Sequence, residues 1–234
     1  MGLEIFFMRI LNNYNEREWQ LYLHLLPAEK QQLIANYVDP VDRQRSLLAD
    51  LLARHVIADR LNVPIRKVKF QTTKFGKPEL MNDSGVFFNI THSGSWIGVA
   101  LDHQSVGIDI EQVLPIDLDI AERFFSKSEV ADLLSMPQFH QLDYFYQLWT
   151  LKESYLKEEG SGLSRPLNTF AIRFLKDSFR LLEGEEWSKR VFFQTYALES
   201  GYKCSVCARH NRFPEKTSFL SEPAFLQTLS RTDN

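Results

Sequence analysis

Two stretches of this 234-residue chain carry apolar residues at the spacing of a long helix, and strand-like runs follow each of them. The first helical stretch covers residues 43–61 before Pro64, and the second covers residues 142–159 before Gly160. Alternating runs bounded by turn residues predict strands near the N-terminus and at residues 86–90, 96–101, 106–111, 169–175, 191–198 and 202–208. Helix followed by strands, twice over, predicts an α+β fold of two comparable halves, residues 1–113 and 114–234.

The composition supports folding around a sizeable core and narrows the class of function. With 44% hydrophobic residues, the chain has enough apolar surface for one core or two fused ones. A net charge of -3 does not suit a dedicated nucleic-acid binder, which normally carries a strong basic excess. The N-terminal apolar run is short and broken by Glu4 and Arg9, so we expect a cytoplasmic protein without a membrane partner. The polar tail after Phe213 is expected to be loosely held.

Charge is distributed unevenly along the chain. Residues 43–77 contain nine Lys or Arg and two Asp, whereas residues 109–160 contain eleven Asp or Glu and four Lys or Arg. A basic region and an acidic region would suit an anionic ligand that is held partly by protein cations and partly through a bound metal. Two solvated faces of opposite sign explain the same counts, so charge alone leaves both interpretations open.

The two cysteines, Cys204 and Cys207, lie in the alternating run YKCSVCA. A CxxC pair is typical of zinc and redox sites, but this chain has no second pair. Residues three apart on a strand face opposite sides, so the pattern favours two ordinary buried thiols.

The run VGIDIEQ, residues 106–112, places two carboxylates on one side of a predicted strand. The alternate isoleucines would face the core, while Asp109 and Glu111 project from the other face, about 6.6 Å apart along the strand. Two adjacent carboxylates repel unless a cation lies between them, and oxygen ligands without histidine favour magnesium or manganese over zinc. Gly107 would allow a ligand or another backbone to approach closely. A solvated strand end is the alternative.

The run LWTLKESYLK, residues 148–157, has two distinct helical faces. Apolar side chains at i, i+3 and i+7 would form the buried stripe, which leaves Trp149, Glu153 and Lys157 together on an adjacent face. Glu153 and Lys157 could form an ordinary helical ion pair, worth about 0.2–0.5 kcal/mol. Alternatively, Glu153 is a third oxygen ligand or a general base, and Lys157 contacts a phosphate.

The run NITHSGSW, residues 89–96, reads as a strand that ends in a turn of small residues, with Thr91 and His92 at its tip. Free backbone N–H groups in such a turn are suited to binding a phosphate. A single histidine in a turn is more commonly structural or solvated, so the run is not decisive alone. Nearby in sequence, KFGKP at residues 74–78 forms a rigid loop from which Lys77 could meet an anion.

Taken in order, five runs resemble the signature of the 4′-phosphopantetheinyl transferases, specifically the larger, surfactin-synthetase-activating type: FGKP, NITHSGSW, VGIDIEQ, RFFSKSE and WTLKESYLKEEGSGL. The resemblance extends over nearly the whole chain. It implies a monomer of two pseudo-symmetric α+β halves with coenzyme A bound between them. The implied reaction transfers the 4′-phosphopantetheine moiety of coenzyme A to a serine of an apo carrier protein and releases 3′,5′-ADP.

The resemblance also implies roles for single residues. Asp109, Glu111 and Glu153 match the magnesium ligands, and Glu153 also matches the proposed base. The other matches are to residues that contact coenzyme A. His92 and Thr91 match contacts to the diphosphate, and Lys157 matches a phosphate contact. Lys77, Arg45 and Lys30 match residues around the nucleotide and its 3′-phosphate.

One position departs from the family pattern. Members of this type often carry a further basic residue three positions after the one that Lys30 matches, but this chain has Leu33 there. Binding of the 3′-phosphate would therefore depend more heavily on Arg45 and Lys77. Residues 160–191 resemble the segment that receives the carrier protein.

In the implied reaction, the carrier serine attacks the β-phosphate of coenzyme A, and a carboxylate accepts its proton. Magnesium, Lys157 and His92 would neutralise the charge that develops. The same groups would serve a magnesium-dependent diphosphate hydrolase, and a non-catalytic module that binds coenzyme A or carrier proteins is a third interpretation. By resemblance, the carriers belong to peptide or polyketide synthetases of antibiotic biosynthesis, with the fatty-acid acyl carrier protein as a further candidate.

Overall fold

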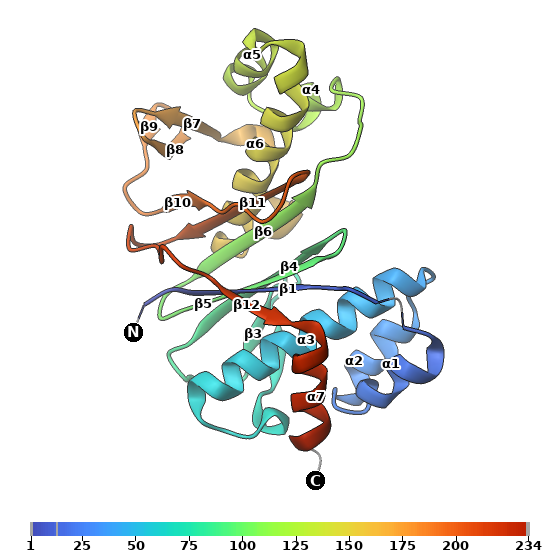
Figure 1. The fold of residues 1–234 in the computed structure, drawn as a ribbon. Helices are drawn as coiled ribbons and strands as arrows, with labels where there is room; N and C mark the ends of the chain where they lie inside the picture. Colours follow the sequence, from blue (N-terminus) through green and yellow to red (C-terminus); the bar gives the residue numbers. More distant parts are fainter. Residues whose placement is uncertain (1, 13, 233–234) are drawn as a thin grey trace.

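The computed structural model describes residues 2–12 and 14–232 and has the α+β architecture that the sequence predicts (Figure 1). The first elements in chain order are β1 (Glu4–Arg9), α1 (Glu16–Leu23), α2 (Ala28–Ala35), α3 (Pro40–Leu61), a 3₁₀ turn (Ile65–Lys67), β2 (Phe70–Thr72), β3 (Pro78–Leu80), β4 (Phe87–Ser93), β5 (Trp96–Asp102) and β6 (Val106–Gln112). They are followed by α4 (Ile120–Phe124), α5 (Lys127–Ser135), α6 (Gln138–Glu159), two 3₁₀ turns (Gly162–Ser164, Leu167–Thr169), β7 (Ala171–Leu175), β8 (Ser178–Glu183), β9 (Glu186–Trp187), β10 (Phe192–Thr195), β11 (Tyr202–Ala208), β12 (Ser218–Ser221) and α7 (Glu222–Thr232).

Both predicted long helices are confirmed, as α3 and α6. The backbone N–H of Val41 donates to the side chain of Asp39 at 2.8 Å, which caps the start of α3. The predicted end of this helix at Leu61, before Pro64, is confirmed, and Asn62 caps it in the left-handed conformation at φ 52°. The stop that Gly160 predicts for α6 is confirmed, since this glycine has φ 76°.

Two sheets face each other between the two long helices. The first sheet has the strand order β12-β1-β5-β4, and the second has β10-β11-β6. Their inner faces share one core, which includes Phe7 and Ala100 from the first sheet and Ile108 and Val206 from the second. The outer face of the first sheet packs against α3, and that of the second packs against α6. The long helices therefore form the two outer layers, and the two halves are fused through the sheet-to-sheet core.

The two cysteines lie on β11 and confirm the interpretation as ordinary buried thiols. Cys204 belongs to the core between the sheets, whereas Cys207 belongs to the core beneath α6. Both are unpaired, and burial raises the pKa of each thiol well above its usual value. Neither thiol is therefore suited to metal binding or redox chemistry.

The prediction of a loosely held tail after Phe213 is wrong. β12 pairs in parallel with β1, with Phe6 opposite Ser218, so the last strand returns to the first sheet (Figure 1). On α7, apolar side chains are buried against the core that contains α3. The buried carboxylate of Glu222 also accepts a 2.7 Å hydrogen bond from the backbone N–H of Leu11. Among the described helices, none is long and apolar enough to cross a membrane.

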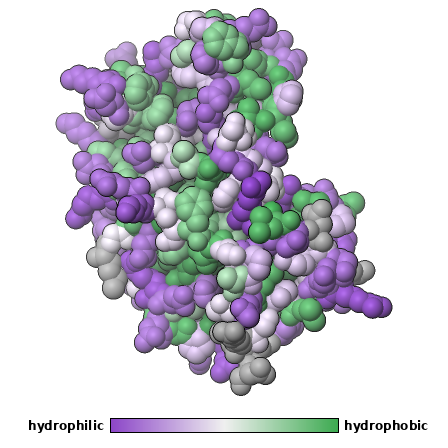
Figure 2. All heavy atoms as spheres, viewed as in Figure 1, coloured by the Kyte–Doolittle hydropathy of each residue, from purple (hydrophilic) through white to green (hydrophobic). Residues whose placement is uncertain are grey.

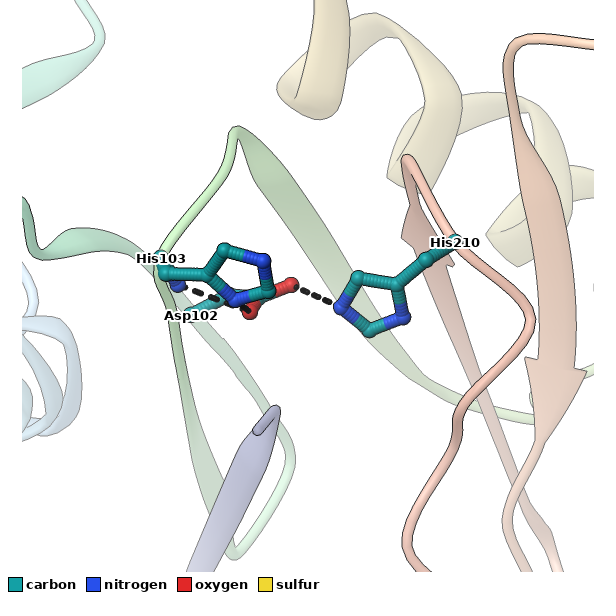
Figure 3. A group of neighbouring side chains, drawn as sticks. All are labelled: Asp102, His103 and His210. Atoms are coloured by element: carbon teal, nitrogen blue, oxygen red, sulfur yellow. Dashed lines mark hydrogen bonds and ion pairs between the residues drawn. The ribbon is translucent and has the colours of Figure 1, made fainter. Parts of the chain in front are cut away.

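A buried carboxylate ties the connection between β5 and β6 to the segment after β11 (Figure 3). Asp102 is fully buried, and its two oxygens lie 2.7 Å from Nδ1 of His103 and 2.8 Å from Nε2 of His210. The backbone N–H of Arg212 donates to Nδ1 of His210 at 3.2 Å, which assigns the ring proton to Nε2. Because both imidazoles contact one buried carboxylate and join two segments far apart in the chain, we interpret the group as a structural tether.

Candidate active site

The walls of one cleft of about 440 Å³ are formed by residues of both halves. The structure brings seven of the nine predicted site residues to it, namely Lys30, Thr91, His92, Asp109, Glu111, Glu153 and Lys157. Trp149, which the helical spacing placed beside Glu153, lines the same cleft. The two other predicted residues, Arg45 and Lys77, line neighbouring cavities.

β6 supplies two of the cleft carboxylates, as its alternation predicts. Its isoleucines are buried between the sheets, and Asp109 and Glu111 point the other way. At Gly107 the helix α6 crosses directly over the strand, and an added Cβ would overlap the Ser154 carbonyl oxygen and lie 2.5 Å from the Glu158 nitrogen. The predicted close approach is therefore that of a helix backbone, and it brings Glu153 and Lys157 of α6 beside the β6 carboxylates.

One edge of β6 pairs with β11, and the other, here called the open edge, is covered by side chains of β4. Three backbone N–H groups of β6 donate to side-chain oxygens of β4, from Ile108 to Asn89 Oδ1 at 2.9 Å, from Ile110 to Thr91 Oγ1 at 3.0 Å, and from Gln112 to Ser93 Oγ at 3.1 Å. The three acceptors alternate along β4 and so share one face of the strand. Each buried N–H left unpaired would cost about 1–3 kcal/mol, so these three contacts, here called the seam, hold the two sheets in register.

The prediction that Thr91 and His92 lie at the tip of a turn is wrong. β4 continues through both of them to Ser93, and the turn is formed by Gly94 and Ser95. The strand extends this far because its backbone pairs with β5 as far as Ser93, which lies opposite Trp96. His92 is thus presented from a strand, with its side chain on the face opposite to the seam contacts.

Asp109 is almost completely buried, at 4% exposure. Its Oδ1 accepts hydrogen bonds from Lys157 Nζ at 2.6 Å and from Thr91 Oγ1 at 3.3 Å. Its Oδ2 is buried without a hydrogen-bond partner among the described residues. Burial raises the pKa of Asp109 in spite of the Lys157 ammonium. Lys157 therefore pairs with Asp109, and the alternative of an ordinary ion pair with Glu153 is not found among the described residues.

The charged forms of the other two cleft carboxylates are destabilised by burial and by repulsion from Asp109. Burial, followed by repulsion from Asp109, raises the pKa of Glu111 to about 7, although a hydrogen bond from Ser93 opposes the shift. Burial and then Asp109 also raise the pKa of Glu153. The chemistry of the donor set, three carboxylates with one buried oxygen that lacks a partner among the described residues, is the oxygen chemistry that magnesium or manganese prefers. The ligand atoms of these three carboxylates do not all lie within 4.8 Å of one another, whereas those of Asp102, His103 and His210 do.

His92 lies at the mouth of the cleft among cations. Desolvation by the surrounding protein lowers the pKa of its imidazole, and repulsion from Lys157 and then Arg45 lowers it further. An anion bound beside these three residues would favour the protonated imidazole and would relieve the repulsion. The local charge therefore favours occupation of the cleft by an anionic ligand.

The remaining predicted cations are engaged with protein oxygens. Lys30 Nζ lies 3.6 Å from the buried carboxylate of Asp50 at the cleft wall. Arg45 donates from Nε to the carbonyl oxygen of Gly94 at 2.8 Å, which fixes the β4–β5 turn. Lys77 donates to three oxygens, each at 3.3 Å, of Ser105, Val106 and Glu158. Burial lowers the pKa of the Lys77 amine, and its contacts join the start of β6 to the end of α6.

Sequence reasoning missed the groups that set the orientation of α6. The buried amine of Lys152 donates to both carboxylate oxygens of Glu129, each at 2.7 Å, and to the carbonyl oxygen of Phe170 at 2.8 Å. Lys152 is adjacent to Glu153, so this contact fixes which face of α6 meets the cleft. The signal was present in the motifs RFFSKSE and WTLKESYLKEEGSGL, which carry the two partners. Burial nonetheless lowers the pKa of Lys152 to about 8.

Three carboxylates and several cations line one cleft of an α+β fold, an arrangement suited to an anionic ligand such as a phosphate ester. The family model for the 4′-phosphopantetheinyl transferase superfamily matches residues 105–207, and the model for the 4′-phosphopantetheinyl transferase N-terminal region matches residues 13–104. The chain belongs to the 4′-phosphopantetheinyl transferase superfamily, and it is an enzyme.

Individual relatives agree with the family models. The 4′-phosphopantetheinyl transferase Sfp of Bacillus subtilis is 39% identical over 92% of this chain and 98% of its own length. The 4′-phosphopantetheinyl transferase gsp of Aneurinibacillus migulanus is 35% identical over 88% of this chain and 86% of its own. The human L-aminoadipate-semialdehyde dehydrogenase-phosphopantetheinyl transferase is 31% identical over 82% of this chain and 70% of its own length. These matches confirm the resemblance to the surfactin-synthetase-activating type.

Proposed function

We propose that this enzyme transfers the 4′-phosphopantetheine moiety of coenzyme A to a serine of an apo carrier protein, and that the cleft is the site of transfer. The observation that carries the proposal is the convergence of Asp109, Glu111 and Glu153 with Lys157 and His92 on one cavity. A diphosphate with a bound metal needs carboxylates that hold the metal and cations that neutralise the charge of the phosphates.

The three carboxylates would hold magnesium, which supplies positive charge beside the diphosphate when it is bound. The chain's own cations would act on the same phosphates. Lys157, which lies 2.6 Å from Asp109, is close enough to reach an oxygen of a phosphate held there. His92 and Thr91 would hold the diphosphate from the β4 side, and the charge that develops on the departing 3′,5′-ADP would be neutralised in place.

Transfer needs one bond to form and one to break. The serine oxygen of the carrier forms a bond to the β-phosphorus, the bond from that phosphorus to the bridging oxygen breaks, and 3′,5′-ADP leaves with the bonding electrons. Glu153 would accept the serine proton, since its raised pKa suits a general base better than that of an ordinary carboxylate. No protein nucleophile is required, and both cysteines are buried.

Lys30, Arg45 and Lys77 are proposed to surround the nucleotide and its 3′-phosphate. Lys30 lines the cleft itself, and Arg45 is near enough to His92 to lower its pKa. Leu33, where a further basic residue is common in the family, is 61% exposed on α2 and offers no charge. The 3′-phosphate would therefore rely on fewer cations.

The proposed acceptors are carrier domains of peptide or polyketide synthetases, with the fatty-acid acyl carrier protein as a second class. Residues 160–191, the proposed carrier segment, include a three-stranded sheet in which Phe174 is 61% exposed. Figure 2 shows hydrophobic patches among hydrophilic ones over the part of the molecule where α4, α5 and β7–β9 lie in Figure 1. Mixed apolar and polar surface of this kind suits a transient protein partner. We propose that the enzyme acts as a cytoplasmic monomer.

One assay tests the proposed reaction. The protein is incubated with coenzyme A, magnesium and an apo carrier protein, and the carrier is weighed by mass spectrometry. The expected result is a carrier heavier by one phosphopantetheine, and none when magnesium is removed with a chelator. Consumption of coenzyme A without a gain in carrier mass would instead indicate a hydrolase, and no change in either would indicate a binding module.

A further inference from the structure

Ser93 lies where the seam between the two sheets meets the cleft carboxylates. It is the last residue of β4, and its hydroxyl is engaged on both sides. The oxygen accepts the backbone N–H of Gln112 at 3.1 Å, which closes the open edge of β6. The hydrogen is donated to Oε2 of Glu111 at 2.8 Å. One hydroxyl therefore satisfies a backbone donor and a carboxylate of the same strand, one residue apart.

Among the described residues, the carboxylate of Glu111 has fewer hydrogen-bond partners than that of Asp109. Asp109 is held by both Lys157 and Thr91, whereas Ser93 is the hydrogen-bond partner found for the Glu111 carboxylate among the described residues. Asp109 and Glu153 lie on the same cleft and repel it. A half-buried glutamate with two flexible torsions would turn toward solvent under that repulsion unless something held it.

The position of Ser93 is itself fixed by contacts from two other elements, β11 and α3. The backbone N–H of Ser95 donates to the hydroxyl of Tyr202 at 3.0 Å, and Arg45 binds the carbonyl oxygen of Gly94. Gly94 has φ 55°, and an added Cβ there would overlap the Tyr202 hydroxyl. Contacts from β11 and α3 therefore fix the turn after Ser93. They also fix the position from which the Ser93 hydroxyl reaches Glu111.

We propose that Ser93 is a positioning residue of the metal site, because its hydroxyl holds the Glu111 carboxylate toward Asp109 and Glu153. This inference rests on the proposed function, since it assigns Ser93 to the magnesium site. Groups that orient a metal ligand through a hydrogen bond typically change metal affinity by about 10–100-fold when they are removed. Loss of the Ser93 hydroxyl is expected to weaken magnesium binding by that factor, with turnover at saturating magnesium much less affected.

The test measures metal binding directly rather than activity. Chelator-treated protein with coenzyme A and no carrier is titrated with Mn²⁺, and the free ion is followed by electron paramagnetic resonance; Mg²⁺ is titrated by calorimetry. The variants are Ser93→Ala, which removes the hydroxyl, and Ser93→Thr, which keeps it. Ser95→Ala is the matched control, because the same change in the same turn affects a hydroxyl that contacts Tyr202 and no carboxylate among the described residues.

A second control separates positioning from general loosening of the seam. Asn89→Ala removes the acceptor for the Ile108 N–H in the same row of contacts, but Asn89 contacts no cleft carboxylate among the described residues. Both Asn89→Ala and Ser93→Ala are expected to lower the melting temperature. Only Ser93→Ala is expected to weaken Mn²⁺ and Mg²⁺ binding by about 10–100-fold. Ser93→Thr and Ser95→Ala are expected to bind both ions like the wild type.

Two outcomes would overturn the role of Ser93 alone. These are wild-type affinity for both ions in Ser93→Ala, or an equal loss of affinity in Asn89→Ala, which would show that any weakening of the seam has the same effect. A wild-type protein that binds neither ion would overturn the proposed metal site, and the role of Ser93 with it. The wild-type titration therefore distinguishes the two failures.

Discussion

Replacement of Glu153 by glutamine separates a role in transfer from a role in stability. The structure leaves Glu153 without the ordinary helical partner, because the Lys157 amine lies on Asp109 at 2.6 Å. Burial and Asp109 raise the pKa of Glu153, so its charged form is unfavourable in the folded protein. Glutamine keeps the volume and removes the charge. The folded state is therefore expected to be as stable as the wild type or more stable.

Activity should move in the opposite direction. If Glu153 binds the metal or accepts the serine proton, Glu153→Gln should lower turnover at least ~10²-fold, which corresponds to about 2.7 kcal/mol of transition-state stabilisation. An exposed ion-pair partner would contribute only about 0–1 kcal/mol to stability and nothing to transfer. The two accounts therefore differ in both the sign of the stability change and the size of the activity change.

The assay is carrier modification across a magnesium series, beside thermal melts of the same samples. Glu159→Gln is the matched control, because Glu159 lies on the same helix but pairs with Arg165 outside the cleft. The control should keep near-wild-type turnover and lose at most about 1 kcal/mol of stability. Near-normal turnover of Glu153→Gln at saturating magnesium, or a loss of turnover matched by an equal loss of stability, would refute the assignment.

Three further predictions concern the ligand and pH. Dephospho-coenzyme A should bind more weakly than coenzyme A by about 1.5–3 kcal/mol if Arg45 and Lys77 meet the 3′-phosphate, and equal affinities in calorimetry would exclude that role. Acetyl-coenzyme A should also donate its arm, as judged by carrier mass, because the reacting bond lies at the diphosphate; strict rejection would place the thiol in an enclosed site. Because the pKa of Glu111 rises from 4.5 to about 7 on folding, the metal-free protein should lose stability as pH rises from about 4.5 to 7. Glu111→Gln should flatten that slope in chelator-treated melts, and a slope of the opposite sign would contradict it.

Local patterns of the sequence predicted the parts of the site that depend on a single element. The alternation of VGIDIEQ placed Asp109 and Glu111 on the face opposite the isoleucines, and the helical period of LWTLKESYLK placed Glu153 and Lys157 on one face. Both periodicities follow from backbone geometry alone. The structure agrees with each of them.

Contacts between distant segments could not be predicted in the same way. The pairing of Lys157 with Asp109 and the return of β12 to β1 join residues far apart in the chain, and no local period encodes them. The alternation of Asn, Thr and Ser in β4 was visible, but only the structure shows that these side chains replace a strand at the open edge of β6. The position of Thr91 and His92 was predicted wrongly because the pairing of β4 with β5, which carries the strand to Ser93, is not visible in the small residues of the run.

The measurement that tests the central claim most directly is the location of the metal. Crystals grown with coenzyme A and Mn²⁺ would show the ion by its anomalous scattering. The account predicts one strong peak in the cleft, about 2.0–2.2 Å from carboxylate oxygens of Asp109, Glu111 and Glu153, with the diphosphate as a further ligand. A strong peak at Asp102, His103 and His210 with none in the cleft would contradict it.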